Sequence, residues 1–313
     1  MFFVTDLSVK IGKVTFPGPV WLASGTSGFG EELEEYIDFG TVGAIVTKTV
    51  TLKERQGNPP PRVLETASGL LNSIGLENKG AKWFRENKYP FLKKQKTKVV
   101  VSFSASELGE FTECARMLTD RSFPDAFEVN LSCPNVAHGG DKGLLTAQDK
   151  NAVQKAVKAV KKATDRPIIV KLSPNVTSIG DIARAAEKAG ADAVAVVNTY
   201  QAVAVDAEKM APYFSRVVGG LSGPAIKPLA LKAVRDVYKA VKIPVIGIGG
   251  IMNGIDVAEF MLCGASAVEV GTATLRDPFA YNKILNEFLD YLKRHGIKKA
   301  RSLTGKLKEK AEQ

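Results

Sequence analysis

Few side chains in this sequence could act as a general acid or base, and Cys133 is the strongest candidate. The chain has two histidines and three cysteines. Cys133 ends a strand-like run in the segment Asn130-Leu-Ser-Cys-Pro-Asn135. Cys114 and Cys263 lie in helix-like apolar patterns, where a cysteine is usually a small core hydrophobe. A thiol near lysines titrates closer to neutral pH. We therefore predict that Cys133 is the catalytic base.

Two lysines, Lys48 and Lys171, interrupt apolar strand-like runs at matching positions. A buried ammonium must be paired with a carboxylate or bind an anion. A structural ion pair is the alternative for each lysine, and we predict that both bind a ligand. Asn72, which lies among apolar residues in a long loop, is a further candidate for holding a ligand through its amide.

Glycines follow the last two strand-like runs, in Gly247-Ile-Gly-Gly250 and in Gly271-Thr272. Glycine lets backbone N–H groups approach a phosphate closely, although tight turns also use it. Because both glycine groups stand at corresponding strand ends, we predict a phosphate site there. No group of His, Asp and Glu has the spacing of metal ligands, so no metal site is expected.

These residues stand near the ends of eight β-rich runs, each followed by a helix-like pattern. The runs are almost continuously apolar, as in parallel strands that are covered on both faces. Eight such units predict an α/β fold, a single (β/α)8 TIM barrel over residues 1–313 with its function on the loops after the strands. The expected strands are Val20–Gly25, Ala44–Val50, Lys98–Ala105, Ala126–Cys133, Pro167–Ser173, Ala193–Thr199, Pro244–Gly250 and Ala267–Ala273.

Helices are expected between these strands, one of them over Thr146–Thr164 and another capped by Thr177 or Ser178. A doubly wound open sheet is the competing architecture. It would want a Gly-x-Gly-x-x-Gly motif after the first strand, and Ala23–Gly28 does not supply one.

Ahead of the barrel, a short alternating pattern runs from Leu7 to Ile11, and Val14 and Phe16 follow. The pattern predicts an N-terminal β-hairpin that turns near Gly12-Lys13 and plugs the bottom of the barrel.

The formal net charge is +10, and 45% of the residues are hydrophobic. The lysines cluster without interleaved aromatic residues at 93–98 and 155–162, which favours solvated helix faces over a nucleic-acid surface. An odd number of cysteines without a Cys-x-x-Cys motif argues against disulfides, and no apolar run is long enough to span a membrane. We expect a cytoplasmic protein with no nucleic-acid or membrane partner.

Taken together, these sequence segments resemble the class 1 dihydroorotate dehydrogenases, and the resemblance extends from Leu22-Ala-Ser-Gly-Thr26 to Val270-Gly-Thr272. The most specific are Lys48-Thr-Val-Thr-Leu52, Gly57-Asn-Pro-Pro-Pro-Arg62, Asn72-Ser-Ile-Gly-Leu76, Asn130-Leu-Ser-Cys-Pro-Asn135 and Gly219-Gly-Leu-Ser-Gly-Pro-Ala-Ile-Lys-Pro228. The last resembles the 1B subgroup, whose catalytic chain pairs with an FAD and iron–sulfur subunit.

The resemblance implies oxidation of dihydroorotate to orotate in pyrimidine biosynthesis, with one FMN per chain. Cys133 would take the C5 proton while C6 delivers hydride to flavin N5. The residues implied for the substrate are Lys48, Asn72, Ser73, Ile74, Gly75, Leu76, Asn130, Asn135, Asn198 and Thr199. Those implied for FMN are Ser24, Lys48, Thr49, Ser102, Asn130, Lys171, Val197, Gly223, Gly249, Gly250, Gly271 and Thr272. A homodimer joined by the electron-transfer subunit is expected.

The sequence departs from the family's usual pattern at three places. Gly75-Leu-Glu-Asn-Lys-Gly80 replaces Gly-Leu-Gln-Asn-Pro-Gly, Ser102 replaces an asparagine, and Tyr200-Gln-Ala-Val-Ala204 replaces a glycine-containing segment. These differences bear on the shape of the substrate side and on the partner.

Two other functions, and one variant of the same function, compete. The dihydrouridine synthases are FMN barrels that act on RNA, but they carry a further helical domain where only Ile297–Gln313 follows here. A non-catalytic basic binding protein would have no reason to gather Lys48, Cys133 and Lys171 on one face. A 1A-type enzyme would work as a homodimer and pass its electrons directly to fumarate.

Overall fold

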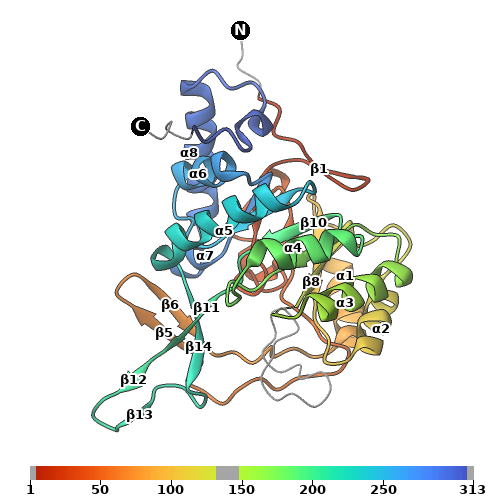
Figure 1. Cartoon of the computed structure of the whole chain (residues 1–313), viewed down its shortest axis with the longest axis vertical. Coiled ribbons are helices and arrows are strands. Elements are labelled where there is room, and N and C mark those ends of the chain that lie inside the picture. Colours follow the sequence, from red (N-terminus) through yellow and green to blue (C-terminus); the bar gives the residue numbers. More distant parts are fainter. Residues whose placement is uncertain (1–4, 132–147, 309–313) are drawn as a thin grey trace.

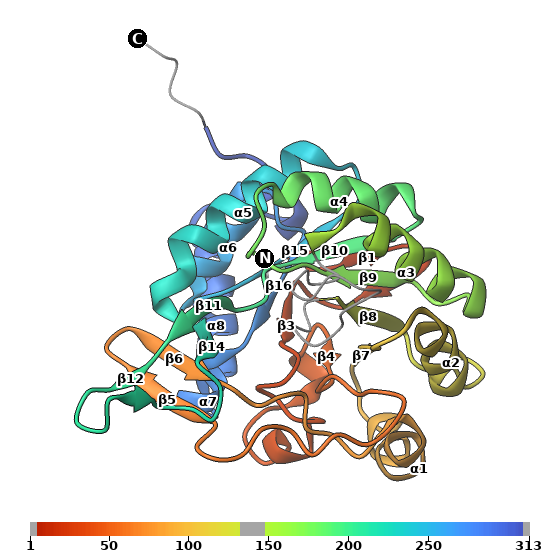
Figure 2. The ribbon, with the colours of Figure 1, turned by 60° about the horizontal axis from the view of Figure 1, so that its bottom comes forward.

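The computed structural model describes residues 5–131 and 148–308 of the chain. Eight parallel strands close a barrel, in the order β3, β4, β7, β8, β9, β10, β15 and β16, and helices surround it (Figures 1 and 2). This confirms the predicted (β/α)8 TIM barrel. The strands are Val20–Leu22, Ile45–Val46, Val99–Phe103, Ala126–Asn130, Ile168–Lys171, Ala193–Val196, Val245–Ile248 and Ala267–Val270.

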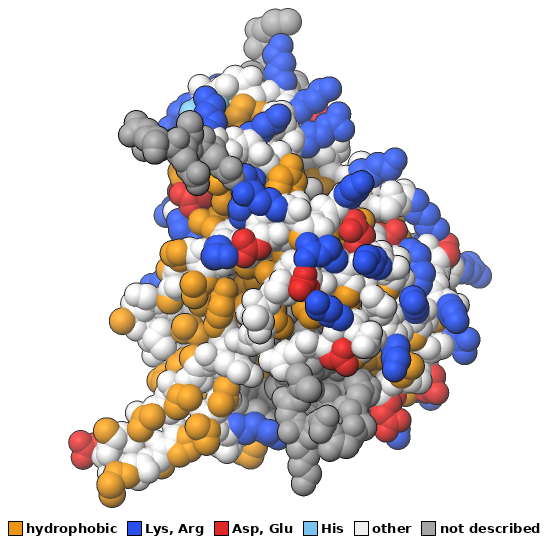
Figure 3. Space-filling model, in the orientation of Figure 1, with side chains coloured by type: hydrophobic (Ala, Val, Ile, Leu, Met, Phe, Trp, Pro, Cys, Tyr) orange, Lys and Arg blue, Asp and Glu red, His pale blue; other side chains and the backbone are white. Residues whose placement is uncertain are grey.

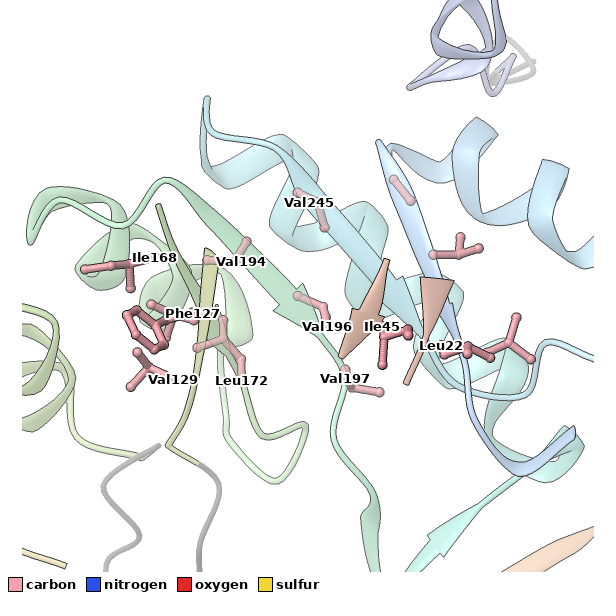
Figure 4. Close-up of a cluster of buried hydrophobic side chains, with 14 of the residues drawn as sticks. Leu22, Ile45, Phe127, Val129, Ile168, Leu172, Val194, Val196, Val197 and Val245 are labelled. Atoms are coloured by element: carbon pink, nitrogen blue, oxygen red, sulfur yellow. The ribbon is translucent and has the colours of Figure 1, made fainter. Parts of the chain in front are cut away.

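Burial on both faces explains why these strands read as continuous apolar runs. In β7, Val99, Val101 and Phe103 belong to the core between the strands and the helices, whereas Val100 faces the barrel interior. Figure 4 shows the outer core, with Phe127 and Val129 of β8 close to Ile168 and Leu172. Both sides of each strand are therefore shielded from water.

The helices lie in the connections that the sequence predicts, with two differences. The connection from β3 to β4 holds only short 3-10 helices, η1 (Glu31–Leu33) and η2 (Phe39–Thr41). The helix expected from Thr146 is α3 and begins at Lys150, because the Asp149 side chain accepts a hydrogen bond from Asn151 N and caps it there. The α-helices are α1 (Ala81–Leu92), α2 (Leu108–Leu118), α3 (Lys150–Ala163), α4 (Ile179–Lys188), α5 (Lys227–Ala240), α6 (Gly254–Cys263), α7 (Thr272–Arg276) and α8 (Ala280–Arg294).

Ser178 is the residue that caps α4, since its hydroxyl accepts a hydrogen bond from Asp181 N.

Within the described residues, no helix is both long enough and apolar enough to cross a bilayer. Figure 3 shows Lys and Arg side chains spread over the helical part of the molecule and interspersed with acidic ones. This distribution fits the prediction that the basic residues lie on solvated helix faces.

The N-terminal hairpin forms as predicted. Strands β1 (Val9–Ile11) and β2 (Val14–Phe16) pair antiparallel, and Gly12 in the turn has φ +54°. Val9, Ile11 and Phe16 are buried in one cluster with residues that point into the barrel, and the Phe16 ring lies 4.5 Å from that of Trp21. The hairpin thus closes the apolar end of the barrel interior.

A second sheet, which the sequence analysis did not predict, projects from the barrel (Figure 1). It pairs β11 (Tyr200–Val203), β14 (Val218–Ser222), β6 (Gly69–Asn72) and β5 (Val63–Thr66) antiparallel, and β12 (Val205–Asp206) with β13 (Ala211–Pro212) extends the arm. The part that contains Asn72 had been interpreted as a long loop. Pairing places Asn72 opposite Gly220 and so joins the second and sixth connections above the strand ends.

Candidate active site

A cavity of about 390 Å³ lies at the carboxyl ends of the barrel strands, within the size range of small-molecule sites. All but one of the residues predicted to bind the cofactor line it. These are Ser24, Lys48, Thr49, Asn130, Lys171, Val197, Gly223, Gly249, Gly250, Gly271 and Thr272. The exception is Ser102, which is fully buried behind Thr49.

A second cavity, of about 550 Å³, adjoins the first beneath the projecting sheet. It is lined by the predicted substrate residues Asn72, Ser73, Ile74, Gly75, Leu76, Asn130, Asn198 and Thr199. Six of these line both cavities, namely Asn72, Ile74, Leu76, Asn130, Asn198 and Thr199. The two cavities therefore share a wall of amide and hydroxyl groups, where a ligand in one would meet a ligand in the other.

One end of the first cavity is built from glycine-containing turns. Gly249 and Gly250 follow β15 with φ +127° and +78°, a region that favours glycine. A Cβ on Gly250 would lie 2.8 Å from the carbonyl oxygen of Gly223, so the turn after β15 packs directly on the one before α5. Thr272 donates a hydrogen bond to the Ser222 hydroxyl over 2.9 Å, which joins the turn after β16 to the end of β14. This end suits an anionic group such as a phosphate.

Lys171 lies at the barrel end of the same cavity, between two buried glutamates. Its ammonium is 3.5 Å from Glu128 Oε2 and 3.4 Å from Glu269 Oε2. Burial alone would lower the pKa of Lys171, but the two carboxylates outweigh it and raise that pKa. The lysine therefore remains charged, as a ligand-binding cation requires. The ion pair that was the alternative for Lys171 is therefore present, and its contact with a ligand stays a prediction.

A chain of hydroxyl groups links the cavity wall to Glu128. Ser24 and Thr49 are 3.2 Å apart, and Thr49 and Ser102 are 2.9 Å apart. Ser102 donates to Glu128 Oε1 over 2.9 Å. Ser102 thus orders Thr49 and Glu128 without lining the cavity, which leaves its predicted contact with a cofactor untested.

Asparagine side chains organise the shared wall. Asn130 Nδ2 donates to Thr49 Oγ1 over 3.2 Å, and Asn198 Nδ2 donates to Asn130 Oδ1 over 3.4 Å. Asn72 Nδ2 donates to the Gly220 carbonyl over 3.1 Å, which fixes its direction from the projecting sheet. The amides of Asn72 and Asn198 keep further hydrogen-bonding capacity for a polar ligand.

Glu77 and Lys79, which belong to one of the departures from the family pattern, form ion pairs. Glu77 pairs with Arg62 at 2.5 Å, and Lys79 pairs with Glu54 at 2.6 Å. Tyr200 begins β11 and pairs with Leu221. The Arg62–Glu77 pair joins the residue before β5 to the segment after β6, within the long second connection.

Cys133 and Asn135, together with His138, lie outside the described residues, so the predicted base has no position here. The other cysteines match the interpretation as core residues: Cys114 is buried and Cys263 half-buried. Burial raises the pKa of the Cys114 thiol to about 12 and also raises that of Cys263. In residues 5–131 and 148–308, no group of His, Cys, Asp and Glu is arranged to hold a metal ion.

Two functional candidates, Glu128 and Glu269, were missed in the sequence analysis. Each is a charged residue inside an apolar strand, the same signal that singled out Lys171. Applied to acidic residues as well, that rule would have found them.

A larger groove, of about 1070 Å³, lies between α5, α6 and α8 and is lined by residues of these helices and by Asn253, which caps α6. Charged side chains line it, and Lys227 there already pairs with Asp256 at 2.7 Å and with Glu259 at 2.9 Å. The groove lacks the convergence of strand ends that marks the smaller cavities.

Comparison with known proteins agrees with this geometry. Residues 6–292 match the family described as dihydroorotate dehydrogenase. A protein of Geobacter sulfurreducens is 50% identical over 302 residues, which cover 96% of this chain and 98% of that one. A protein of Bacteroides thetaiotaomicron is 47% identical over 304 residues, covering 97% and 99%. Both are named dihydroorotate dehydrogenase B (NAD(+)), catalytic subunit.

Proposed function

The chain belongs to the dihydroorotate dehydrogenase family, and we propose that it oxidises dihydroorotate to orotate in pyrimidine biosynthesis with FMN as the immediate acceptor. The observation that carries this proposal is the pair of adjoining cavities. One has glycine turns at one end and Lys171 at the other, and it shares a wall of asparagines with its neighbour. We infer that FMN takes the first and the substrate the second.

The first cavity fits FMN by the chemistry of its walls. The turns at Gly223, Gly249 and Gly250 would hold the phosphate, and Ile248 and Ile251 give an apolar surface for the ring. A Cβ on Gly25, which has φ +92° and also lines this cavity, would have no heavy atom within 4 Å, so that part of the wall is open. Lys171, Thr49 and Asn130 would meet the polar edge of the ring.

FMN, when bound, supplies the acceptor for the hydride that leaves C6 of dihydroorotate. The protein must hold the substrate and remove the C5 proton. We assign the proton to Cys133, as the sequence predicts, and the substrate's carboxylate to the ammonium of Lys48, which lines the first cavity, so the substrate would extend across the shared wall to reach it. The amides of Asn72, Asn130 and Asn198, with Asn135, would orient the ring of the substrate.

We propose that residues 1–313 form one catalytic domain and that the electrons leave through a separate subunit carrying FAD and an iron–sulfur cluster. The chain has three cysteines, fewer than the roughly four ligands that such a cluster needs, and Cys114 is buried in a helix. The relatives named as B-type catalytic subunits support an NAD-linked rather than a fumarate-linked enzyme. Free Cys114 and Cys263 support a cytoplasmic location.

We also propose a homodimer. The projecting arm carries exposed apolar side chains, among them Val205 at 68% and Met210 at 91% exposure, and Figure 3 shows hydrophobic surface along it. Exposed apolar patches usually mark interfaces. Sedimentation of the isolated chain tests this: a dimer that Met210→Asp dissociates supports the proposal, and a monomer contradicts it.

Titration with FMN and then with orotate tests the assignment of the two cavities. The FMN-loaded chain should show a change in its visible spectrum when orotate binds beside the flavin. A chain that releases FAD instead of FMN, or whose flavin spectrum does not respond to orotate, contradicts the proposal.

A further inference from the structure

Three ionisable side chains lie together inside the barrel, and only one of them lines the cavity. Glu128 of β8, Lys171 of β9 and Glu269 of β16 are 0%, 5% and 1% exposed. Lys171 faces the cavity, and the two carboxyl groups contact its ammonium from behind at 3.5 and 3.4 Å. We call these three residues the buried charge cluster.

The cluster is unbalanced when all its members are ionised, because two carboxylates face one ammonium. An uncompensated charge in a buried site is costly, and taking up one proton removes it. The structure shows which carboxylate oxygens could bind that proton. Glu269 Oε1 is buried and accepts no hydrogen bond, and the buried Glu128 Oε2 has only the long contact of 3.5 Å with the Lys171 ammonium.

Glu269 is the better proton holder of the two. Glu128 Oε1 already accepts a hydrogen bond from Ser102, whereas Glu269 Oε1 accepts none. Burial raises the pKa of Glu269, Lys171 opposes that shift, and the charge of Glu128 adds to it. The net direction is upward.

The neighbouring strand residues supply no competing charge. Trp21 and Ile248 flank Glu269 in the sheet, Ser102 flanks Glu128, and Ala195 and Asn130 flank Lys171. Among the described residues that line the cavity, the other charged side chains are Lys48 and Glu77. Both carry their charge on loops above the strand ends rather than inside the barrel.

We propose that Glu269 is a positioning residue that holds one proton against Glu128 and so sets the net charge behind Lys171. With the proton in place, the buried charge cluster is neutral and the ammonium is fully available to an anionic ligand. Without it, the cluster carries one negative charge and opposes negative charge in the cavity. This inference rests on the proposed function. It implies that the reduction potential of bound FMN depends on whether Glu269 carries its proton.

Glu269→Gln tests the proposal, because glutamine keeps the shape of the protonated side chain and cannot ionise. The first readout is urea unfolding of the full chain without FMN, across a series of pH values. A raised folded-state pKa gives stability that is complete below the unfolded pKa and is lost as pH rises through the folded one. The parent's folding equilibrium should therefore weaken, by up to about tenfold per pH unit, relative to that of Glu269→Gln.

Two further variants complete this test. Glu113→Gln, at an exposed position of α2, is the matched control and should keep the parent's pH profile. Glu128→Gln leaves Glu269 alone with Lys171, so the pH-dependent loss should disappear there as well. The Glu128→Gln variant alone provides the test if Glu269→Gln does not fold. Parallel profiles for the parent and for whichever cluster variants fold would overturn the proposal.

The second readout is the midpoint potential of the FMN-loaded chain against pH. The parent's potential should fall more steeply than that of Glu269→Gln, because reduction favours retention of the Glu269 proton. Equal slopes with FMN bound would overturn the link to the flavin. A chain whose unfolding profile behaves as expected but which binds no FMN would instead contradict the proposed function.

Discussion

Replacing Lys171 with methionine should destabilise the barrel strongly and in a pH-dependent way. The ammonium lies 3.4 and 3.5 Å from two carboxyl groups, separations at which an ionised pair is worth about 5 kcal/mol at an effective dielectric constant of about 20. Desolvation cancels much of that attraction, and removing one partner of a buried pair costs about 3–5 kcal/mol. We expect a loss of this size at about pH 8 and a smaller one at about pH 5, where a proton on Glu269, whose pKa is raised by burial, lowers the negative charge that is left behind.

Urea unfolding of the full chain, followed by circular dichroism at both pH values, measures this loss. Lys13→Met is the matched control, because its pair with Asp165 at 2.6 Å is 57% and 64% exposed. That variant should lose less than about 1 kcal/mol. Changing Glu128 and Glu269 to glutamine in the Lys171→Met background should restore much of the stability. A Lys171→Met loss no larger than that of Lys13→Met, or equal at both pH values, would refute the reasoning.

Four further results are expected. Cys133→Ser should bind FMN and orotate but reduce its flavin much more slowly in stopped flow, since a serine hydroxyl does not ionise near neutral pH; an unchanged rate would remove Cys133 from the mechanism. Lys48→Ala should weaken orotate binding about tenfold to a hundredfold in a titration of the flavin spectrum, whereas equal affinity would make Lys48 structural. Gly250→Ala should weaken FMN binding, because its Cβ would lie 2.8 Å from the Gly223 carbonyl oxygen; Gly109→Ala, with no heavy atom within 4 Å of the added Cβ, is its control and should bind FMN as the parent does. The isolated chain, once reduced, should be reoxidised slowly by NAD, and fast reoxidation by fumarate would move it to the 1A group.

The barrel could be predicted because burial on both faces constrains nearly every residue of its strands. Runs such as Ala193–Val196 have no exposed position at which a polar residue could break the pattern. The ends of those strands then identified the cavity, since parallel strands bring their carboxyl ends to one face. Lys171 was found in this way, from a charge inside an apolar run.

The projecting sheet could not be predicted in the same way. Its strands are two to five residues long, and side chains such as Val203 and Val218 are exposed although apolar. Its key contact joins Asn72 to Gly220, which are 148 positions apart, and no local pattern encodes such a pairing. The position of Ser102 behind Thr49 depends likewise on the pairing of Val50 with Phe103, which lies about fifty positions away in the chain, rather than on the residues next to Ser102.

Anaerobic addition of dihydroorotate to the purified, FMN-loaded chain tests the proposed function most directly. We predict that the visible absorption of the flavin is lost and that one orotate forms per flavin reduced, without any partner subunit. A flavin that stays oxidised in the presence of excess dihydroorotate would contradict the proposed function.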